Sequence, residues 1–581
     1  MSNDDRRLIE DYLPIEAISK EASREKNVRK GHIATLHLWW ARRPLVACRA
    51  AVYGALVPAS RFRPRSGPED KRDSLARANA ARFVEALSKY PGNPQVIAQA
   101  QQHILEAHAE RLTEDTGKKV TVQDITEGRA PRPKVLDMFA GGGSIPLEAL
   151  RLGCEAYALD LNPVAHIVEL CTLVYPQKYG KPDPSVRGMT GPKNEKGETT
   201  WGGLAEEVRY WGNWVLKKLK AAVGDLYPLI PDPEFKGKKN CAQTSWLKES
   251  PENARPGYLM PVGYLWTRTV ACKNPRCRAM VPLVKQTWLC KKPGRYVALK
   301  MVAPKGKLEV RFEVVESHSE QALGLDPEAG SKRGNAPCPF CGTVADSDYV
   351  KAEGCAGRLA DQLMAVACTR PGKQGKVYVA AKDVTPATPD EKAIQDRIRD
   401  LCHHTGLTVP NEPIINDAKN SFWTRLYGIT TYGQVFSPRQ LLTQLSLCHL
   451  ARECGGALME EGHPEGVSTA IRTYIAVMID KLADFNSVQC TWNYTGGRGV
   501  GHSFTKQVLP MAWDYVETNP FNPDGASWLA ILDDTPAMIE GVKASGCMAA
   551  HVLRGDATSL PYPDASQDAV VTDPPYYDNV S

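Results

Sequence analysis

At 581 residues the chain is too long for one compact core, and a domain size of roughly 150 residues predicts three or four units. A hydrophobic share of 43% and a charged share of 24% are typical of a globular protein, and the absence of an apolar run of about 18 residues excludes an integral membrane protein. The net charge of +6 permits a polyanionic partner without requiring one.

The N-terminus lacks the apolar region of a secretory signal, so a cytoplasmic location and no membrane partner are expected. In that reducing compartment the sixteen cysteines are interpreted as thiols or metal ligands rather than disulfides.

Residues 1–130 are rich in helix formers and predict a helical domain, with helices at about 73–90 and 94–114. Between residues 24 and 44, six Lys and Arg side chains surround Trp39 and Trp40. A nucleic-acid surface needs cationic groups for phosphates beside aromatic planes for bases. The alternative is that both tryptophans are core anchors of a helix whose charges are solvated.

Residues 131–175 predict the first part of an α/β domain. Val135 and Leu136 indicate a short parallel strand, the glycines at 141–143 a tight turn beside a ligand, and residues 145–150 a helix. The turn lacks Gly-Lys-Ser/Thr, and Pro146 replaces the third glycine of a dinucleotide fingerprint. Neither a P-loop nor a dinucleotide site is therefore favoured.

A second strand at residues 155–160 ends in Asp160, about 20 residues beyond the glycine turn. An acidic residue at that place accepts hydrogen bonds from ribose hydroxyls in nucleotide-like ligands. An ordinary surface aspartate is the alternative.

Residues 176–545 form an insertion too long for a loop, and it is expected to be mostly helical outside residues 256–350. A stripe of apolar residues predicts a helix over 204–219, and Ser437 with Gln440 forms a capping box at the start of another. A third helix is predicted over residues 468–482.

Two cysteine pairs occur within residues 256–350. Their spacing on proline- or glycine-containing turns predicts a structural zinc ribbon with four thiolate ligands, Cys272, Cys277, Cys338 and Cys341. Three further cysteines are interpreted as buried free thiols, namely Cys290, Cys355 and Cys368.

Residues 546–581 return to the strand pattern and predict the second part of the α/β domain. A third strand at 549–553 leads to Asp556, and a fourth at 569–572 leads to Asp573, Pro574, Pro575 and Tyr576. An exocyclic ring amine is a poor nucleophile because its lone pair is delocalised into the ring. The Asp573 carboxylate and a backbone carbonyl aimed by the two prolines would draw on its hydrogens, and the Tyr576 ring would stack on a flipped base.

The first strand and its turn carry a family resemblance. Asp137, Phe139 and Ala140 before Gly141 and Gly143 form a string that resembles motif I of S-adenosylmethionine-dependent DNA methyltransferases. The Asp-Pro-Pro-Tyr string is similar to that of the DNA amino-methyltransferases, in which it most often marks adenine N6 modification.

The wider chain resembles adenine-specific DNA methylases that contain a zinc ribbon and open with a domain of unknown function carrying a stretch like residues 37–44. The resemblance implies an α/β fold with a Rossmann-like methyltransferase sheet and a large α+β insertion that reads the target. It also implies S-adenosylmethionine and structural Zn²⁺ as cofactors, DNA as partner, and a restriction-modification or phage-defence role, with other subunits of that system as further partners. Asp556 would accept from the cofactor's adenine amine.

In that fold the catalytic motif ends the fourth of seven strands, so a C-terminally incomplete sheet is expected here. Either the sequence is a fragment of a longer protein, or a separate chain completes the sheet. Cytosine N4 methylation is the nearest alternative. Cytosine C5 chemistry would need a nucleophilic cysteine after a proline. It is not favoured, because the one Pro-Cys pair, Pro337-Cys338, belongs to the zinc ribbon. A non-catalytic nucleic-acid-binding protein is an alternative of another class.

Overall fold

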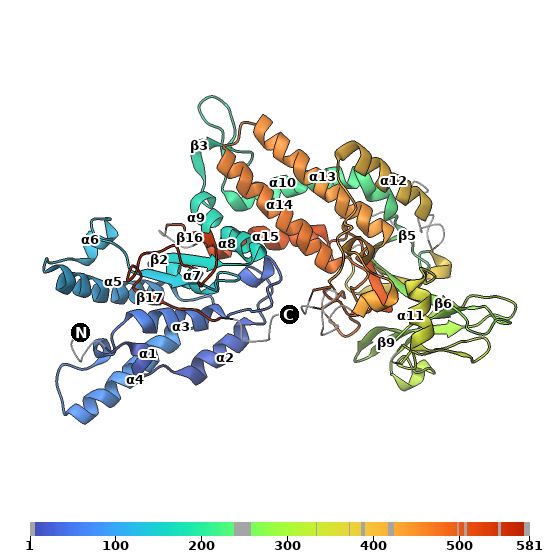
Figure 1. Ribbon diagram of the computed structural model, residues 1–581, viewed down its shortest axis with the longest axis horizontal. Helices are drawn as coiled ribbons and strands as arrows, with labels where there is room; N and C mark the ends of the chain where they lie inside the picture. Colours follow the sequence, from blue (N-terminus) through green and yellow to red (C-terminus); the bar gives the residue numbers. More distant parts are fainter. Residues whose placement is uncertain are drawn as a thin grey trace. The chain divides into compact units, whose positions relative to one another are not determined.

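The computed structural model describes residues 6–236, 257–332, 334–370, 372–384, 390–415, 423–496, 499–504, 508–543 and 548–574. Over these ranges the fold is mixed α/β with several sheets (Figure 1). Among the helices so described, none is both long and apolar enough to cross a membrane. The chain divides into unit 1, made of Met1–Tyr210, Gly462–Tyr474 and Asp534–Val580, and unit 2, made of Trp211–Glu461 and Ile475–Asp533.

The N-terminal part of unit 1 is helical, as predicted. Asn93 caps one of its long helices by accepting from the Gln95 and Val96 N–H groups, Pro94 occupies the first helical position, and the helix ends at the left-handed Gly117. The helices are α1 (Leu8–Asp11), α2 (Ile15–Glu25), α3 (Leu45–Leu56), α4 (Glu69–Leu87), α5 (Pro94–Thr116) and α6 (Val122–Thr126).

A four-stranded parallel sheet forms the centre of unit 1. Its strands are β1 (Lys134–Asp137), β2 (Glu155–Asp160), β16 (His551–Arg554) and β17 (Ala569–Val570), in the order β16-β2-β1-β17. Leu136 of β1 pairs with Tyr157 on one side and Val570 on the other. The strands that follow the insertion thus flank the two that precede it.

Short helices follow the first two strands. α7 (Ser144–Arg151) packs on β1 and β2, and α8 (Pro163–Glu169) packs on β2 and β16. The chain continues through a π-helical turn (Leu170–Val174), α9 (Tyr175–Tyr179) and the hairpin β3 (Asp183–Arg187) and β4 (Thr200–Trp201). Because all four strands of the central sheet are parallel, their carboxyl ends meet at one edge.

Unit 2 contains antiparallel sheets. The larger has the order β14-β13-β6-β15, with β5 and β7 also paired to β6, and a second sheet has the order β10-β9-β8. The strands are β5 (Ile230–Pro231), β6 (Tyr258–Ala271), β7 (Met280–Pro282), β8 (Trp288–Lys292), β9 (Arg295–Val302), β10 (Arg311–Ser317), β11 (Ala336–Pro337), β12 (Val344–Ala345), β13 (Ala360–Thr369), β14 (Lys376–Ala380) and β15 (Asp514–Thr518).

Three further helices belong to unit 2: α11 (Ser347–Cys355), α12 (Glu391–Thr405) and α13 (Pro438–Glu460). The capping box predicted for α13 is confirmed, because the Ser437 side chain accepts from the Gln440 N–H and the Gln440 side chain accepts from the Ser437 N–H. Helices α10 (Leu204–Val223), α14 (Glu465–Phe485) and α15 (Trp528–Val542) contribute residues to both units.

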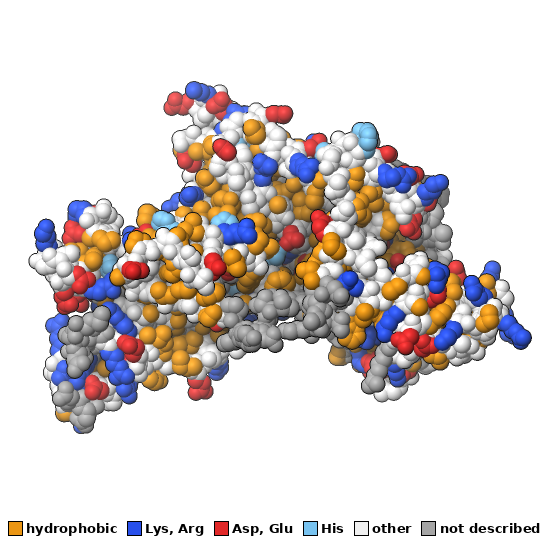
Figure 2. Space-filling model, viewed as in Figure 1, with side chains coloured by type: hydrophobic (Ala, Val, Ile, Leu, Met, Phe, Trp, Pro, Cys, Tyr) orange, Lys and Arg blue, Asp and Glu red, His pale blue; other side chains and the backbone are white. Residues whose placement is uncertain are grey.

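Charged side chains are mixed on the surface. Over the described residues of the face shown in Figure 2, basic and acidic groups are interspersed rather than gathered into one basic surface. On this face, contact with a polyanion would therefore depend on local clusters.

Candidate functional site

Three predicted acidic residues meet at the carboxyl edge of the parallel sheet. Asp137 ends β1 and is buried, and its Oδ1 accepts from the Phe139 N–H at 3.0 Å and from Thr572 Oγ1 at 2.8 Å. Burial raises the pKa of Asp137 to about 6, and the charges of Asp160 and Asp573 add to this effect. The structure therefore brings the ends of β1, β2 and β17 into one electrostatic neighbourhood.

The glycine turn is held by the carboxylate that ends β2. Asp160 Oδ2 accepts from the Gly141 N–H at 2.9 Å, and Oδ1 accepts from the Asn162 N–H at 2.8 Å. Gly143 has a φ of +81°, and a Cβ there would lie 3.0 Å from Thr172 Oγ1. Only glycine fits such a position without strain, which explains the residue type.

Other members of the predicted loop lie beside this turn. Ala140 is buried and its N–H donates to the Leu159 carbonyl at 3.2 Å, whereas the Phe139 side chain is exposed. The loop is therefore anchored to β2 through its backbone while an aromatic ring faces solvent.

Glu169, at the end of α8, belongs to the same neighbourhood and was not predicted from the sequence. Its side chain is fully buried, and neither carboxyl oxygen has a hydrogen-bond partner among the described residues. Burial, followed by the charges of Asp160 and Asp137, raises its pKa to about 9. The sequence feature that could have identified Glu169 is a single acidic residue within the mostly apolar run at 164–174.

The basic tryptophan segment packs on this site. It forms turns and a short 3₁₀ helix (Ile33–Thr35) rather than the α-helix of the alternative interpretation. The Trp39 ring lies against the glycine turn, since a Cβ at Gly141 would be 2.6 Å from Trp39 Nε1. Arg43 forms an ion pair with the Asp573 carboxylate, and its guanidinium donates to the Asp573 carbonyl at 3.4 Å. Trp39 is half-buried and Trp40 is exposed, so neither is a core anchor.

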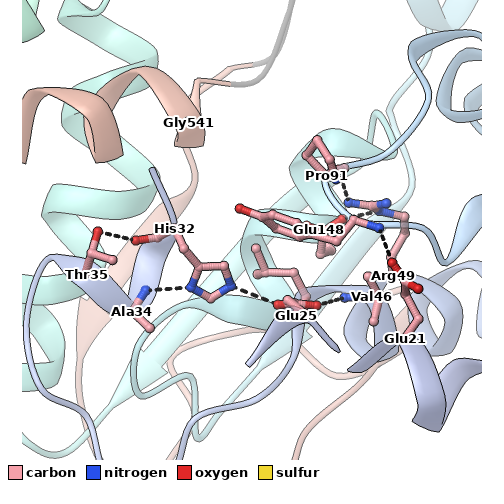
Figure 3. Close-up of polar contacts among 12 residues, drawn as sticks. Glu21, Glu25, His32, Ala34, Thr35, Val46, Arg49, Pro91, Glu148 and Gly541 are labelled. Carbon is pink, nitrogen blue, oxygen red and sulfur yellow. Dashed lines mark hydrogen bonds and ion pairs between the residues drawn. The ribbon is translucent and has the colours of Figure 1, made fainter. Parts of the chain in front are cut away.

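Glu25 holds both ends of the loop that carries Trp39 and Arg43. The His32 ring lies with Nε2 2.8 Å from Glu25 Oε1, and the backbone N–H groups of Leu45 and Val46 at the start of α3 donate to the same carboxylate at 2.7 and 3.0 Å (Figure 3). The Glu25 side chain is 1% exposed, so its hydrogen bonds form away from water, where each is stronger than at the surface.

A buried ion pair joins the N-terminal helices to the helix after the glycine turn. Arg49 Nε of α3 donates to Glu148 Oε2 of α7 at 2.6 Å, with both side chains fully buried (Figure 3). The remaining Arg49 nitrogens donate to the carbonyls of Leu87, Lys89 and Pro91. The helical segment and the sheet therefore share one core.

The other predicted site residues are less constrained. Asp556 follows β16 at the same sheet edge, but it is exposed and its Oδ1 accepts from the Thr558 backbone and hydroxyl, which lowers its pKa. Pro574 is exposed next to Asp573. Pro575 and Tyr576 lie outside the described residues, so their predicted roles remain predictions.

The four predicted zinc ligands come together in unit 2. Their sulfurs all lie within 4.8 Å of one another, with Cys272 and Cys341 3.6 Å apart and Cys277 and Cys338 3.8 Å apart. Tetrahedral coordination with Zn–S bonds of about 2.3 Å requires sulfurs about 3.8 Å apart. The cluster can therefore hold a metal such as zinc, and four thiolates leave no open position for chemistry.

The other cysteines only partly follow the prediction. Cys290 and Cys368 are buried thiols, but Cys355 is exposed at the end of α11. The prediction was wrong for Cys355 because α11 ends at that residue, where the chain turns out to solvent.

Comparison with known proteins identifies only the N-terminal segment. Residues 12–83 match a family described as a protein of unknown function, DUF1156. This match includes Trp39 and Arg43, which contact the sheet edge, Arg49, which pairs with α7, and Glu25, which holds the loop that carries Trp39 and Arg43. No curated protein and no solved structure matches the chain.

Proposed function

We propose that the protein is an S-adenosylmethionine-dependent DNA methyltransferase that acts on adenine N6, with its cofactor at the carboxyl edge of the parallel sheet in unit 1. The observation that carries the proposal is the cluster of carboxyl groups around the glycine turn, namely Asp137, Asp160, Glu169 and Asp573. Asp160 and Asp573 would favour a cationic sulfonium and ammonium and would repel the phosphates of a dinucleotide or of ATP. Asp137 and Glu169, whose pKa values are raised by burial, would ionise as the cation binds.

The sheet order supports the same conclusion. Numbered along the chain within unit 1, the strands lie in the order 3-2-1-4, which is the order at the centre of doubly wound nucleotide-binding sheets. In such sheets the ligand lies outside the carboxyl ends where the order reverses, here between β1 and β17. Asp137 is the last residue of β1, and Asp573 follows β17.

The residues fit the cofactor in type. The glycine turn would receive its methionine part, Asp160 its ribose hydroxyls and Asp556 its adenine amine, while Asp137 and Glu169 face its positive charge. When bound, S-adenosylmethionine supplies an electrophilic methyl group. Its charge would lower the pKa of Asp137 and Glu169 again, so part of the cost of burying these carboxyls would be recovered on binding.

Asp573 would act on the base. Its carboxylate would accept a hydrogen bond from the exocyclic amine, which localises the nitrogen lone pair for attack. After the methyl group is transferred, the same carboxylate would take up the proton that leaves the nitrogen. Arg43, which pairs with Asp573, would orient that carboxylate until the amine of the base takes the place of the guanidinium. Thr572, bonded to Asp137, links the base site to the cofactor site.

The DUF1156 segment is, on this proposal, a part of the methyltransferase site rather than a separate module. It supplies Trp39 over the glycine turn and Arg43 on the catalytic carboxylate. The zinc ribbon would stabilise unit 2, and DNA modification of this kind suits a restriction-modification or phage-defence system.

The test combines cofactor binding with product analysis. Calorimetric titration should show S-adenosylmethionine binding, and mass spectrometry of nucleosides from treated DNA should show N6-methyladenine. Asp573→Ala should lose about 100-fold or more of the transfer while keeping cofactor affinity. N4-methylcytosine instead of N6-methyladenine would refute the choice of base.

Arg43→Met is the matched control, because it breaks the same ion pair and leaves the carboxylate. It should retain more transfer activity than Asp573→Ala. Equal loss in both variants would show that the ion pair, rather than the carboxylate, is required. Absence of S-adenosylmethionine binding to the wild-type protein would refute the proposed function.

A further inference from the structure

A short segment of the DUF1156 region lies over the proposed site between two buried residues. Leu36 and Leu45 are each 1% exposed, whereas none of residues 37–43 is buried. Residues 37–43 are called the flap below. Burial therefore fixes the two ends of the flap but not the flap itself, and its position depends on the contacts that its side chains make.

Polar and close backbone contacts hold the two ends of the flap in place. The Glu25 carboxylate bonds the His32 ring before the flap and the backbone of α3 after it (Figure 3). Gly31 packs against the end of α15, since a Cβ at Gly541 would overlap the Gly31 carbonyl oxygen. Because these contacts lie outside residues 37–43, the flap can move while its ends stay fixed.

One contact of the flap is made by Arg43 with Asp573. The guanidinium pairs with the Asp573 carboxylate and donates to the Asp573 carbonyl at 3.4 Å. The exocyclic amine of a base likewise presents N–H donors, and the proposed reaction brings them to the same carboxylate. The two side chains are 30% and 40% exposed, and ion pairs that water reaches contribute little to stability. An entering base can therefore displace the guanidinium.

A second contact is made by Trp39 with the glycine turn. A Cβ at Gly141 would lie 2.6 Å from Trp39 Nε1, and one at Gly142 would lie 3.7 Å from Trp39 Cδ1. The methionine part of the cofactor is proposed to lie on this same turn. The ring and the ligand therefore compete for one surface, and the ring must move aside before the ligand binds.

We infer that the flap closes the empty site, with Arg43 in the place of the base and Trp39 in the place of the cofactor, and that it opens when either ligand enters. The inference rests on the proposed function, because it describes how the same site is regulated. Both halves of the site open together, since one short segment carries both side chains. For a ligand that binds only the open form, the apparent affinity is the intrinsic affinity multiplied by the open fraction.

Calorimetric titration of Arg43→Met tests the closed state. The substitution removes the ion pair with Asp573, so the open fraction rises and the cofactor should bind at least about fivefold more tightly than to the wild type. Arg42→Met is the matched control, because Arg42 is an exposed neighbour in the flap and its loss changes the net charge equally. Cofactor affinity should be unchanged in this variant.

The choice of ligand separates opening of the flap from an effect of charge. Removing Arg43 also makes the site more negative, which by itself strengthens binding of the cationic S-adenosylmethionine. The titration is therefore repeated with S-adenosylhomocysteine, whose sulfur is uncharged. Opening of the flap predicts the same gain in affinity for both ligands. A gain for S-adenosylmethionine alone, or no gain for either, overturns the inference.

Hydrogen–deuterium exchange followed by mass spectrometry observes the flap without relying on cofactor binding. The amides of residues 37–43 should exchange at least about fivefold faster in Arg43→Met than in the wild type, and Arg42→Met should exchange like the wild type. Bound S-adenosylhomocysteine should also speed their exchange in the wild type, because it holds the flap open. Slower exchange in that complex would show that the flap closes over the cofactor, which overturns the inference.

The proposed function and the flap fail in different ways. If the wild type binds neither S-adenosylmethionine nor S-adenosylhomocysteine, the proposed function is refuted, and with it the ligands assigned to the two contacts of the flap. If the wild type binds both ligands but the flap exchanges equally fast in Arg43→Met and in the wild type, the proposed function stands and the closing flap is refuted.

Discussion

A carboxyl group buried without a partner is costly, and Glu169 shows how the site accommodates one. Its pKa rises from an ordinary value of 4.5 to about 9, so at neutral pH it is protonated. The folded state then binds one more proton than the unfolded state between these two values. Stability must therefore fall as the pH rises through this window, by up to about 1.4 kcal/mol per pH unit.

Glu169→Gln should remove this pH dependence, because the amide has the same shape and carries no charge. We expect the variant to melt at a higher temperature than the wild type at pH 8, with the difference shrinking towards pH 5. Thermal unfolding followed by circular dichroism from pH 5 to 9 measures it. Glu114→Gln, at an exposed position of α5, is the control and should leave the dependence of melting temperature on pH unchanged. If the melting temperatures of wild type and Glu169→Gln change with pH in parallel, the prediction is contradicted.

At the level of elements, the Arg49–Glu148 pair joins α3 to α7 and hence the DUF1156 segment to the sheet. Arg49→Met leaves Glu148 paired with Arg151 alone, and Glu148→Leu leaves Arg49 bonded to backbone carbonyls. Removing one member of a buried ion pair costs about 3–5 kcal/mol. Arg49→Met and Glu148→Leu alone should each lower the melting temperature of unit 1 markedly. The double variant should regain part of the loss, but not all, because three backbone carbonyls also lose their Arg49 donor.

Differential scanning calorimetry of the four proteins gives the coupling between the two positions. A double variant that melts as low as the less stable single variant would show that the pair does not act as a unit. Single variants that melt like the wild type would contradict the buried geometry itself.

Local signals predicted many elements well. β2 has the predicted bounds, α5 begins at the predicted residue 94, α13 begins at its predicted capping box, and the four zinc cysteines cluster as their spacing indicated. β16 begins at His551, two residues later than predicted, because the preceding Ala550 N–H bonds to the Leu173 carbonyl instead of a neighbouring strand. Caps, alternation and cysteine spacing depend on near neighbours in the chain, so a sequence displays them directly.

The parts that could not be predicted depend on contacts between distant segments. Nothing near Trp39 in the sequence indicates that its ring covers a glycine turn about 100 residues further on. Arg43 is one of the six basic residues between 24 and 44, for which the sequence left a phosphate contact and a solvated charge as alternatives. It pairs with Asp573, more than 500 residues away. The environment of Glu169 also depends on tertiary structure, because its burial is set by elements that the local sequence pattern does not connect.

At the scale of the whole molecule, the chain has two units with separate sources of stability. All four clustered cysteines belong to unit 2, where they join the end of β6 to the β11–β12 hairpin. We expect one zinc ion per chain by mass spectrometry of the metal, and none in Cys338→Ser. Loss of the metal should lower the melting temperature of unit 2 by several degrees and expose residues 272–341 to protease.

Unit 1 should keep its S-adenosylmethionine affinity in the same zinc-free protein. Cys355→Ser is the control, because this exposed cysteine is not part of the cluster and its replacement should leave the zinc content unchanged. Full metal content in Cys338→Ser would exclude the four-thiolate site.

The order of strands in the parallel sheet also determines when the sheet can form during translation. β1 and β2 leave the ribosome early, while their neighbours β17 and β16 follow some 400 residues later, which at about 5–20 residues per second is a delay of tens of seconds. Throughout that interval the outer edges of both strands are unpaired and open to pairing with other nascent chains. Residues 211–461 and 475–533 of unit 2 are synthesised in the meantime, so the segment that follows them pairs with β1 and β2 and brings Asp573 to its place.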